Sequence, residues 1–358
     1  MISLTDRKWK DFAVPEVFQS IQRGKRLKNA DHIPGDVPYV SSTANNNGVD
    51  DYIEASEGTR VFRNCISLAN SGSVGTAFYE PFAFVASDHV TSLQCEEANE
   101  YIYLFLTAVL EQQGSNFNFN REINDLRIKK MRVMLPVTDE GKPDYQFMED
   151  YIREVMTAKR KQYRDFVENR LKSLGLDLAN EGGWSEELKS RNWKSFVVKD
   201  IADVFSGQDI YAQERIDGKT PLVTAVGVNN GIGYFVGNDN DSRAEGSISV
   251  VRNGASVGKA FYHRYSALYG NDCRRMKLKM TNSEFANVFI TQVIRMQNKA
   301  FSYSRKLGTG RLENLKVMLP ATDNGDPDYD FMESFGRKMM SNKYNQYLAY
   351  LAMSDTVS

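Results

Sequence analysis

The stretch VMLPVTDEGKPDYQFME at residues 133–149 occurs a second time, as VMLPATDNGDPDYDFME at residues 317–333. The two stretches are identical at 13 of 17 positions and lie 184 residues apart. Identity of this extent at a fixed spacing is typical of an internal duplication. The stretch therefore indicates that the two halves of the chain are copies of one unit.

Shorter matches extend the duplication over almost the whole chain. At offsets of 183 or 184 residues, the first half has counterparts in the second half for the following segments: Trp9-Lys10 with Trp193-Lys194, Asn46-Asn47-Gly48 with Asn229-Asn230-Gly231, SGSVGTAFY at 71–79 with NGASVGKAFY at 253–262, and FNFNR at 117–121 with FSYSR at 301–305. We infer a tandem pair of units of roughly 170 residues each, close to the usual size of one domain. The stretch around residues 175–192 would join them.

Each unit has the same predicted order of elements. Short apolar runs such as 65–68 and 248–251, separated by Gly and Asn turns, predict a β-rich first part. Apolar residues at steps of three and four predict a helix at 99–113 and another at 283–298. A short strand then ends in the Met-Leu-Pro triplet of the repeated stretch. The predicted fold class is α+β.

A long helix follows the repeated stretch in both halves, at roughly 145–174 and 329–352. Asp144 and Asp328 are the predicted N-caps, because a carboxylate at that position accepts from unpaired helix N–H groups. Each helix carries one apolar stripe among many charges, so it must pack against a partner. We expect the two helices to pair as an antiparallel coiled coil about a pseudo-two-fold axis. The predicted division is 1–144, 145–192, 193–328 and 329–358, with a globular head before each helix.

Composition excludes several classes of protein. The chain has 45 basic and 46 acidic residues, a net charge of −1, which excludes a uniformly basic coat. Its mean hydropathy is −0.48 and no apolar run approaches the roughly 20 residues of a membrane helix, so we expect a cytoplasmic protein. Three cysteines without paired spacing argue against a disulfide framework. Three scattered histidines leave little material for a metal site, and we predict none.

The plan of two variable heads, each followed by a long helix, resembles the specificity (S) subunits of type I restriction–modification systems and of their type IIB relatives. The resemblance covers residues 9–353 and is carried by the repeat itself, the two Ser/Gly-rich turns, and the segments NREINDLRIKKMRVMLP and GTGRLENLKVMLP before the long helices. The TD-x-G-x-PDY turn is closer to the type IIB members. The sequence leaves the type I or type IIB context open.

The resemblance implies a non-catalytic DNA reader. Each head would recognise one half of a bipartite target in double-stranded DNA, and the helices would set the spacer and dock two DNA methyltransferase subunits. A helix of 30 residues is ~45 Å long, which matches ~13 base pairs at ~3.4 Å each. The chain itself would bind no cofactor, and S-adenosylmethionine would sit in the partner methyltransferase. A restriction subunit is a further candidate partner, and a membrane is not expected.

Three pairs of segments contain candidate DNA-contacting residues, since Arg or Lys suits guanine and Asn or Gln suits adenine. In the first half these are Arg23, Lys25, Arg26 and Lys28 of a basic loop, Asn45 beside the Asn-Gly turn, and Asn118, Asn120 and Arg121 of FNFNR. In the second half they are Gln208, Tyr211, Gln213 and Arg215 of the comparable loop, Asn229, and Ser304, Arg305 and Lys306. The alternatives are ordinary solvated loops, a structural Asn-Gly turn, and a half-buried strand with Phe117 and Phe119 on one face.

No catalytic residues are predicted. The Ser/Gly-rich turns lack the Lys-Ser/Thr of a phosphate-binding loop, GIGYFVG at 231–237 fails dinucleotide spacing, and no acid-x-Lys follows the PDY motifs as a nuclease would require. Two other classes remain in competition with the DNA reader. One is an enzyme with two pseudo-symmetric active sites, and the other is a scaffold or regulator that binds only the methyltransferase.

Overall fold

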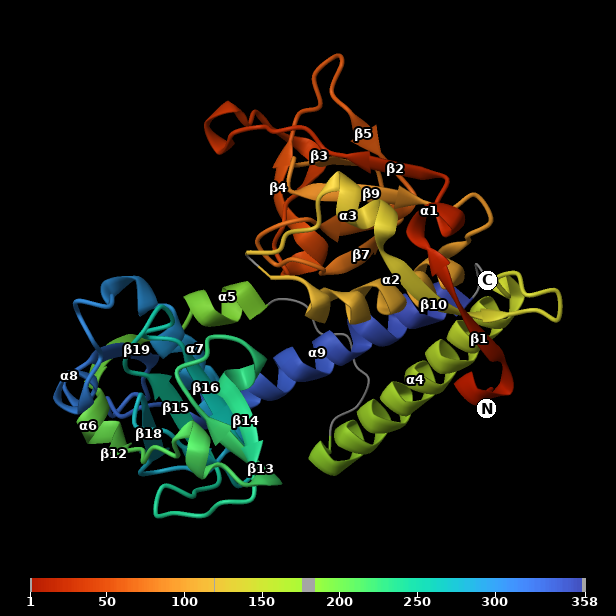
Figure 1. The fold of residues 1–358 in the computed structure, drawn as a ribbon. Coiled ribbons are helices and arrows are strands. Elements are labelled where there is room, and N and C mark those ends of the chain that lie inside the picture. The colour runs from red at the N-terminus through yellow and green to blue at the C-terminus, as the bar shows by residue number, and fades with distance from the viewer. Residues whose placement is uncertain (1, 119, 176–183, 356–358) are drawn as a thin grey trace. The chain divides into compact units, whose positions relative to one another are not determined.

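The computed structural model describes residues 2–118, 120–175 and 184–355. The chain divides into two compact units, Met1–Tyr163 and Arg164–Ser358, which are drawn in Figure 1. Both units contain sheets and helices, which confirms the mixed α and β content expected from the sequence. The segment 176–183 of the predicted linker lies outside the described residues.

A four-stranded antiparallel sheet forms the centre of unit 1. Its strand order is β2-β9-β6-β7, with bounds Ser20–Arg23, Val90–Gln94, Cys65–Ala69 and Ala77–Glu80. All five residues of β6 are buried, which explains why its sequence is continuously apolar or small. Helix α2 (Glu100–Gln113) covers this sheet, and its Leu106 and Leu110 pack with Ile66 and Leu93 in one core.

A second sheet in unit 1 has the order β4-β3-β8-β5. Its strands are Val49–Ile53, Pro34–Val40, Phe84–Ala86 and Val61–Phe62. A separate ribbon pairs β1 (Lys8–Ala13) with β10 (Arg132–Val137), so that Trp9 lies opposite Pro136. The short helices α1 (Val14–Val17) and α3 (Asp125–Lys130) complete this unit before α4 (Tyr145–Leu174) begins.

Unit 2 repeats this topology. Its central sheet is β12-β18-β15-β16, with bounds Ala202–Ser206, Cys273–Leu278, Ser247–Val251 and Ala260–His263. The second sheet has three strands, β14 (Ile232–Val236), β13 (Asp217–Val223) and β17 (Leu268–Tyr269). In place of β5 there is a single bridge between Ala244 and Ala267. The ribbon β11 (Trp193–Val197) with β19 (Lys316–Pro320) again puts the Trp opposite the Pro.

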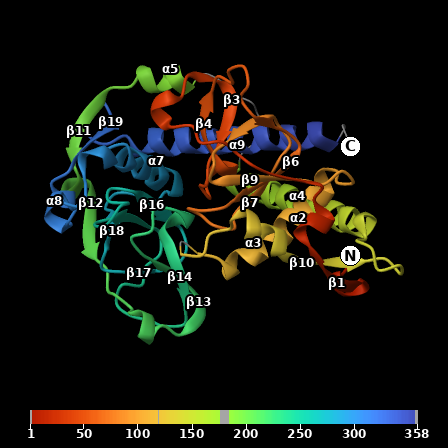
Figure 2. The same ribbon diagram turned by 45° about the horizontal axis from the view of Figure 1, so that its top comes forward.

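The remaining helices of unit 2 are α5 (Trp184–Lys189), α6 (Val198–Ile201), α7 (Glu284–Arg295), α8 (Thr309–Glu313) and α9 (Tyr329–Asp355). Helix α7 lies along β16, as Figures 1 and 2 both show. Both long helices begin where the sequence predicts, directly after Asp144 and Asp328. No helix within the described ranges is both long and apolar enough to cross a membrane.

The N-cap predictions for both long helices are confirmed. The Phe147 N–H donates to Asp144 Oδ1 at 3.0 Å, and the Phe331 N–H donates to Asp328 Oδ1 at 2.9 Å. An arginine from the segment before the first strand of each unit supports the cap. Arg7 pairs with Asp144 at 2.9 Å, and Arg191 lies 3.8 Å from Asp328. The same arginines lie over the Phe147 and Phe331 rings.

Replacing Asp328 by alanine is therefore expected to lower the free energy of unfolding of unit 2 by about 1–2 kcal/mol, because the cap bond is lost. Asp330→Ala is the matched control, since Asp330 is exposed in the first turn of the same helix and makes no cap bond. Its expected cost is below about 0.5 kcal/mol. Urea unfolding of the full chain measures both, and equal costs would contradict the cap's role.

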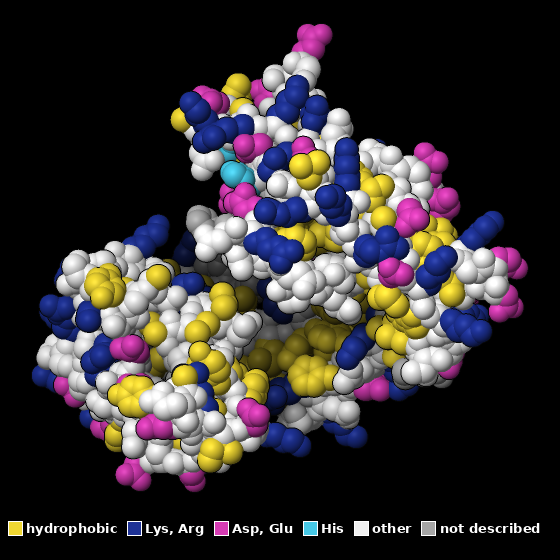
Figure 3. Space-filling view, in the orientation of Figure 1, with side chains coloured by type: hydrophobic (Ala, Val, Ile, Leu, Met, Phe, Trp, Pro, Cys, Tyr) yellow, Lys and Arg dark blue, Asp and Glu magenta, His cyan; other side chains and the backbone are white. Residues whose placement is uncertain are grey.

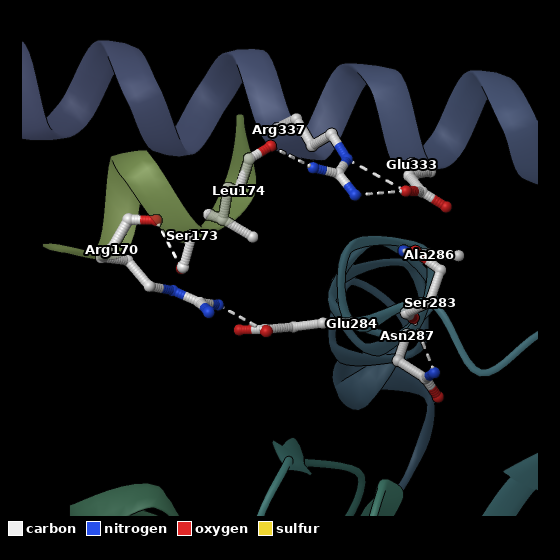
Figure 4. A network of polar contacts seen from close by, with 9 residues as sticks. All are labelled: Arg170, Ser173, Leu174, Ser283, Glu284, Ala286, Asn287, Glu333 and Arg337. Atoms are coloured by element: carbon white, nitrogen blue, oxygen red, sulfur yellow. Dashed lines mark hydrogen bonds and ion pairs between the residues drawn. The ribbon is translucent and has the colours of Figure 1, made fainter. Parts of the chain in front are cut away.

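Within unit 2, the last part of α4 contacts α9 with opposite chain direction. Arg337, near the start of α9, donates to the Leu174 carbonyl at the end of α4 at 2.9 Å. Further along α9, Tyr344 makes an edge-to-face contact with Phe166, eight residues before Leu174. Figure 4 shows the same end of α4 held to α7 by the Arg170–Glu284 ion pair, at 2.5 Å. These contacts with α7 and α9 involve Phe166, Arg170 and Leu174 of α4.

The strand predicted through FNFNR and FSYSR is wrong. Both segments form a tight turn, with single bridges Asn118–Arg121 and Ser302–Arg305. The Asn118 side-chain oxygen accepts from the Asn120 N–H at 3.0 Å, and this local bond competes with strand pairing. The predicted common face of Phe117 and Phe119 involves Phe119, which lies outside the described residues.

Candidate nucleic-acid interface

The three candidate segments of unit 1 meet at one end of the strands of the central sheet. The Gly24 N–H donates to the Val90 carbonyl at 2.9 Å, which places the basic loop beside the start of β9. The Ile123 N–H donates to the Asn70 carbonyl at 2.9 Å, which places the FNFNR turn at the end of β6. The Ser73 N–H donates to the Ser42 carbonyl at 3.0 Å and brings in the loop before Asn45.

We call this set of segments the loop edge of unit 1 and define it as residues 24–28, 41–48, 70–76, 86–90, 117–118 and 120–123. Unit 2 builds the same edge from residues 207–215, 224–231, 252–259, 270–272 and 301–307. There the Gln208 N–H donates to the Tyr269 carbonyl at 2.8 Å, and the Leu307 N–H donates to the Arg252 carbonyl at 3.0 Å. Each unit thus gathers its candidate segments around the ends of two buried strands.

The loops leave the candidate side chains available to a ligand. Every one of the sixteen candidates is exposed except Arg23 and Arg215, which are partly buried. Arg23 ends β2 and donates through Nε to the Asp88 carbonyl at 2.7 Å. Arg215 lies 3.6 Å from the Tyr234 ring centre. These two arginines already have partners within their own unit.

The basic loop of unit 1 borders a cavity of about 300 Å³. Lys25, Arg26 and Arg60 are among its lining residues, while Lys28 precedes a 3₁₀ turn at Asn29–Asp31. Arg60 itself donates to the Arg23 carbonyl at 2.5 Å. Acidic residues share the wall, so the cavity is mixed in charge. Figure 3 shows the same mixture of basic and acidic side chains over the face drawn.

The comparable loop of unit 2 is less basic. Gln208 and Tyr211 are exposed, Tyr211 at 59%. Gln213 lies in a 3₁₀ turn at Ala212–Glu214, where Glu214 accepts from the Tyr211 N–H at 3.0 Å. The two copies therefore present different chemistry on one backbone plan.

The Asn-Gly segments form structural turns, which was the alternative to a DNA contact at these positions. Asn46, Asn47 and Gly48 all have positive φ, between 50° and 75°, and Asn229, Asn230 and Gly231 repeat this conformation. Asn tolerates this region better than other residues with a Cβ. Asn45 and Asn229 remain exposed at the turn, so the turn still presents them on the loop edge.

The FNFNR and FSYSR turns present the last group of candidates. Arg121 lies over the Phe117 ring at 5.7 Å, and Lys306 lies over the Tyr303 ring at 5.4 Å. The Ser304 hydroxyl is 3.0 Å from that of Ser302, and the Arg305 N–H donates to the Ser302 carbonyl at 2.9 Å. The change from Asn to Ser at two positions is thus confined to an exposed turn.

Four further pairs of residues were missed by sequence reasoning, three on the loop edge and one directly beside it in β9 (Thr91) and β18 (Arg274). Shared backbone hydrogen bonds and strand registers make the following positions equivalent: Asn70 with Arg252, Ser71 with Asn253, His89 with Asp272, and Thr91 with Arg274. The set contains no Asp, Glu, Lys or Arg in unit 1 and carries two arginines and one aspartate in unit 2. Ser71 and Asn253 begin the aligned Ser/Gly-rich turns and Asn70 and Arg252 directly precede them, so extending the internal alignment by one residue would have shown two of the four pairs.

The two sets also differ in how many of their polar side-chain atoms have a hydrogen-bond partner. In unit 1 the Thr91 hydroxyl donates to Asn70 Oδ1 at 2.6 Å, and Ser71 Oγ lies 2.5 Å from His89 Nδ1. In unit 2 the Arg252 guanidinium donates to Asp272 at 3.0 Å. Arg252 Nε, Asn253 Oδ1 and Arg274 Nε are buried without a hydrogen-bond partner in the described part of the chain.

One buried titratable side chain occupies the equivalent position in each unit, at the other end of the central-sheet strands from the loop edge. Glu80 lies opposite Cys65 in unit 1, and His263 lies opposite Ser247 in unit 2. Both are fully buried. The Ser67 hydroxyl donates to Glu80 at 2.9 Å, and Ser249 Oγ lies 2.8 Å from His263 Nε2. Burial raises the pKa of Glu80 to about 7 and lowers the pKa of His263 to about 4.

Cysteine and histidine, the usual ligands of zinc, number only three each. The three cysteines are free and buried, and burial raises the pKa of the Cys65 thiol to about 11. Over the described ranges no three His, Cys, Asp or Glu side chains are grouped so as to hold a metal ion.

Known proteins with a similar sequence or fold agree with this architecture. The family model described as the type I restriction modification DNA specificity domain matches residues 6–163 and, a second time, residues 190–347. The specificity subunit S.BcgI of a type II restriction enzyme from Heyndrickxia coagulans is 26% identical over 339 residues, covering 93% of this chain and 94% of that protein.

Among solved structures, the S subunit of the type I restriction–modification system from M. genitalium matches with a TM-score of 0.50 at 17% identity. The match covers 99% of this chain and 96% of that one, and at this identity it supports the fold alone. Because the family model covers most of the chain in two copies, the protein belongs to the family of type I restriction modification DNA specificity domains, whose function is the recognition of DNA sequence.

Proposed function

We propose that this chain is the sequence-reading subunit of an adenine methyltransferase complex, with each unit reading one half of a bipartite target. The observation that carries the proposal is the paired loop edge. Two units share one backbone plan, yet equivalent exposed positions carry different hydrogen-bonding groups. Base edges are distinguished by such groups, whereas shared positions suit phosphate contacts and folding.

In this proposal the heads comprise residues 1–144 and 193–328, and the segments 145–192 and 329–358 contain the helices that separate them. The antiparallel contact of Leu174 with Arg337 supports pairing of α4 with α9 as a coiled coil. Helices paired in this way would set the length of the unspecified spacer. Their remaining exposed faces would dock two methyltransferase subunits, with a restriction subunit as a further partner.

Catalysis would belong to the partners. The chain contains no (N/D)PP(Y/F) motif of an adenine methyltransferase, and the loop edges carry no nucleophile–base pair repeated in both units. The residues of the loop edges suit recognition of bases and phosphates. S-adenosylmethionine would accordingly bind in the methyltransferase subunits.

The test compares adenine-methylation maps of the host genome with and without this gene. A split motif that disappears on deletion is the expected result. Exchange of residues 10–130 for those of a relative with a different target should then change one half-site and leave the other intact.

An unchanged map, with the gene expressed, would contradict the proposal and favour the alternative, a scaffold or regulator that binds the methyltransferase without reading DNA. A motif in which both halves change after the exchange would contradict the assignment of one half-site to each unit.

A further inference from the structure

A concave site in unit 2 lies outside the candidate residues considered so far. It is a pocket of about 360 Å³ between β16 and the exposed side of α7. Phe261, Tyr262 and Tyr265 form its aromatic wall, and Asn230 of the positive-φ turn closes one end. The Asn230 amide is fixed by bonds to the Tyr262 carbonyl at 3.3 Å and the Tyr265 hydroxyl at 3.0 Å.

Two arginines border this pocket and have no carboxylate partner. Arg264 follows β16, and Arg295 ends α7, where its guanidinium lies 5.7 Å from the Phe261 ring centre. Neither forms an ion pair within the described ranges of the chain. The one acid of the pocket, Glu284, is already bound to Arg170 at 2.5 Å. The pocket is therefore positively charged, although the chain as a whole is not.

The equivalent surface of unit 1 has the opposite charge. The close backbone approach of Gly258 to Asn298 repeats that of Gly75 to Gly114 and fixes the correspondence between the two units. Arg295 then corresponds to Glu111, and Arg264 corresponds to Pro81. Glu111 turns toward the sheet, where its Oε1 is 3.5 Å from the Ala77 backbone nitrogen. The aromatic positions are kept, as Phe78, Tyr79 and Phe82.

We propose that this pocket of unit 2 binds the phosphate backbone of duplex DNA through Arg264 and Arg295, and that unit 1 has no equivalent phosphate-binding pair of arginines. The inference rests on the proposed DNA-reading function. A guanidinium suits phosphate because its N–H groups match two oxygens at once. Asn230 belongs to the loop edge and also lines the pocket, so a duplex bound at that edge would lie within reach of the pocket. Contacts of this kind fix position without reading sequence.

The test measures affinity of the full chain, in complex with its methyltransferase subunits, for duplex DNA between 50 and 200 mM NaCl. Each phosphate contact contributes about 0.9 to the slope of log K against log salt. Arg264→Gln and Arg295→Gln should each reduce the slope by about 0.9. Between 50 and 200 mM NaCl the affinity of both proteins falls, and the factor by which it falls should be about ten times smaller for the double variant than for the wild type. The methylated motif should stay the same.

Two controls separate this effect from a general change in charge. Lys199→Gln removes one positive charge from α6 of the same unit, outside the pocket, and should leave the slope within about 0.3 of wild type. Glu111→Gln changes the equivalent helix position in unit 1 and should not reduce the slope. Unchanged thermal unfolding of the double variant shows that the fold is kept.

A wild-type slope in the double variant would overturn the phosphate site while leaving the proposed function intact. A wild-type slope together with loss of the methyltransferase during purification would identify the pocket as a protein-docking site, which also overturns the proposal. Loss of the methylated motif on gene deletion tests the DNA-reading function separately from these measurements.

Discussion

Gly207→Ala is expected to destabilise unit 2 by about 3 kcal/mol or more, the largest effect we predict for a single methyl group. A Cβ at this position would lie 2.2 Å from the Gly270 carbonyl oxygen and 2.4 Å from that of Tyr269. Both are backbone atoms, so the clash cannot be relieved by a side-chain rotation and the two backbone segments must separate. The bond from the Gln208 N–H to the Tyr269 carbonyl would weaken as well.

The matched control is Gly308→Ala in the same unit, where a Cβ meets no atom within 4 Å and φ is −72°. Its expected change is within about 0.5 kcal/mol. Urea unfolding of the full chain gives both values. The first unit offers a replicate, because a Cβ on Gly24 would lie 2.2 Å from the Ser87 carbonyl oxygen. Equal effects of Gly207→Ala and Gly308→Ala would show that the strands are not held this closely.

The two units are expected to respond to pH in opposite directions. In unit 1 the folded pKa of Glu80 is raised from 4.5 to about 7. Its contribution to stability is complete below pH 4.5 and is lost as pH rises to about 7. In unit 2 the folded pKa of His263 is lowered from 6.5 to about 4. Its contribution is complete above pH 6.5 and is lost as pH falls to about 4. Each change amounts to about 3 kcal/mol, since one pKa unit corresponds to about 1.4 kcal/mol.

Hydrogen exchange of the amides in β6 and β15, corrected for the intrinsic pH dependence, measures the two units within one chain. Between pH 5 and pH 8 protection should fall in β6 and rise or hold in β15. Glu80→Gln keeps a group that can accept from Ser67 and removes the titration, so it should flatten the β6 profile alone. His263→Gln should flatten the β15 profile alone. Profiles of the same sign in both wild-type strands would refute the assignment.

The sequence predicted the parts of the fold that depend on local pattern. The starts of α4 and α9 were predicted because a capping aspartate follows a strand and precedes an amphipathic run. The buried strands β6 and β15 were predicted from short apolar runs. The FNFNR turn was predicted wrongly as a strand, because alternation of aromatic and polar residues is the same in both structures and the side-chain bond of Asn118 decides between them.

The candidate site was predicted only in outline. The sequence placed the basic loop and the Asn-Gly turns in the site but could not show that the loop borders the start of β9 or that the first turn packs on β7. The equivalence of Asn70 with Arg252 depends on hydrogen bonds from residues more than 50 positions away in the sequence. The arginines of the unit 2 pocket were missed for the same reason, since Arg264 and Arg295 come from separate elements.

The ribbons β1–β10 and β11–β19 also affect how genes for such chains can recombine. Each ribbon joins the first strand of a unit to the strand just before its long helix, so every unit is closed on itself at the repeated stretch. A crossover between two related genes within that stretch would join intact heads of different ancestry without breaking either core. An unequal crossover within one gene would delete one head and one helix together and leave a half-length chain with a complete fold.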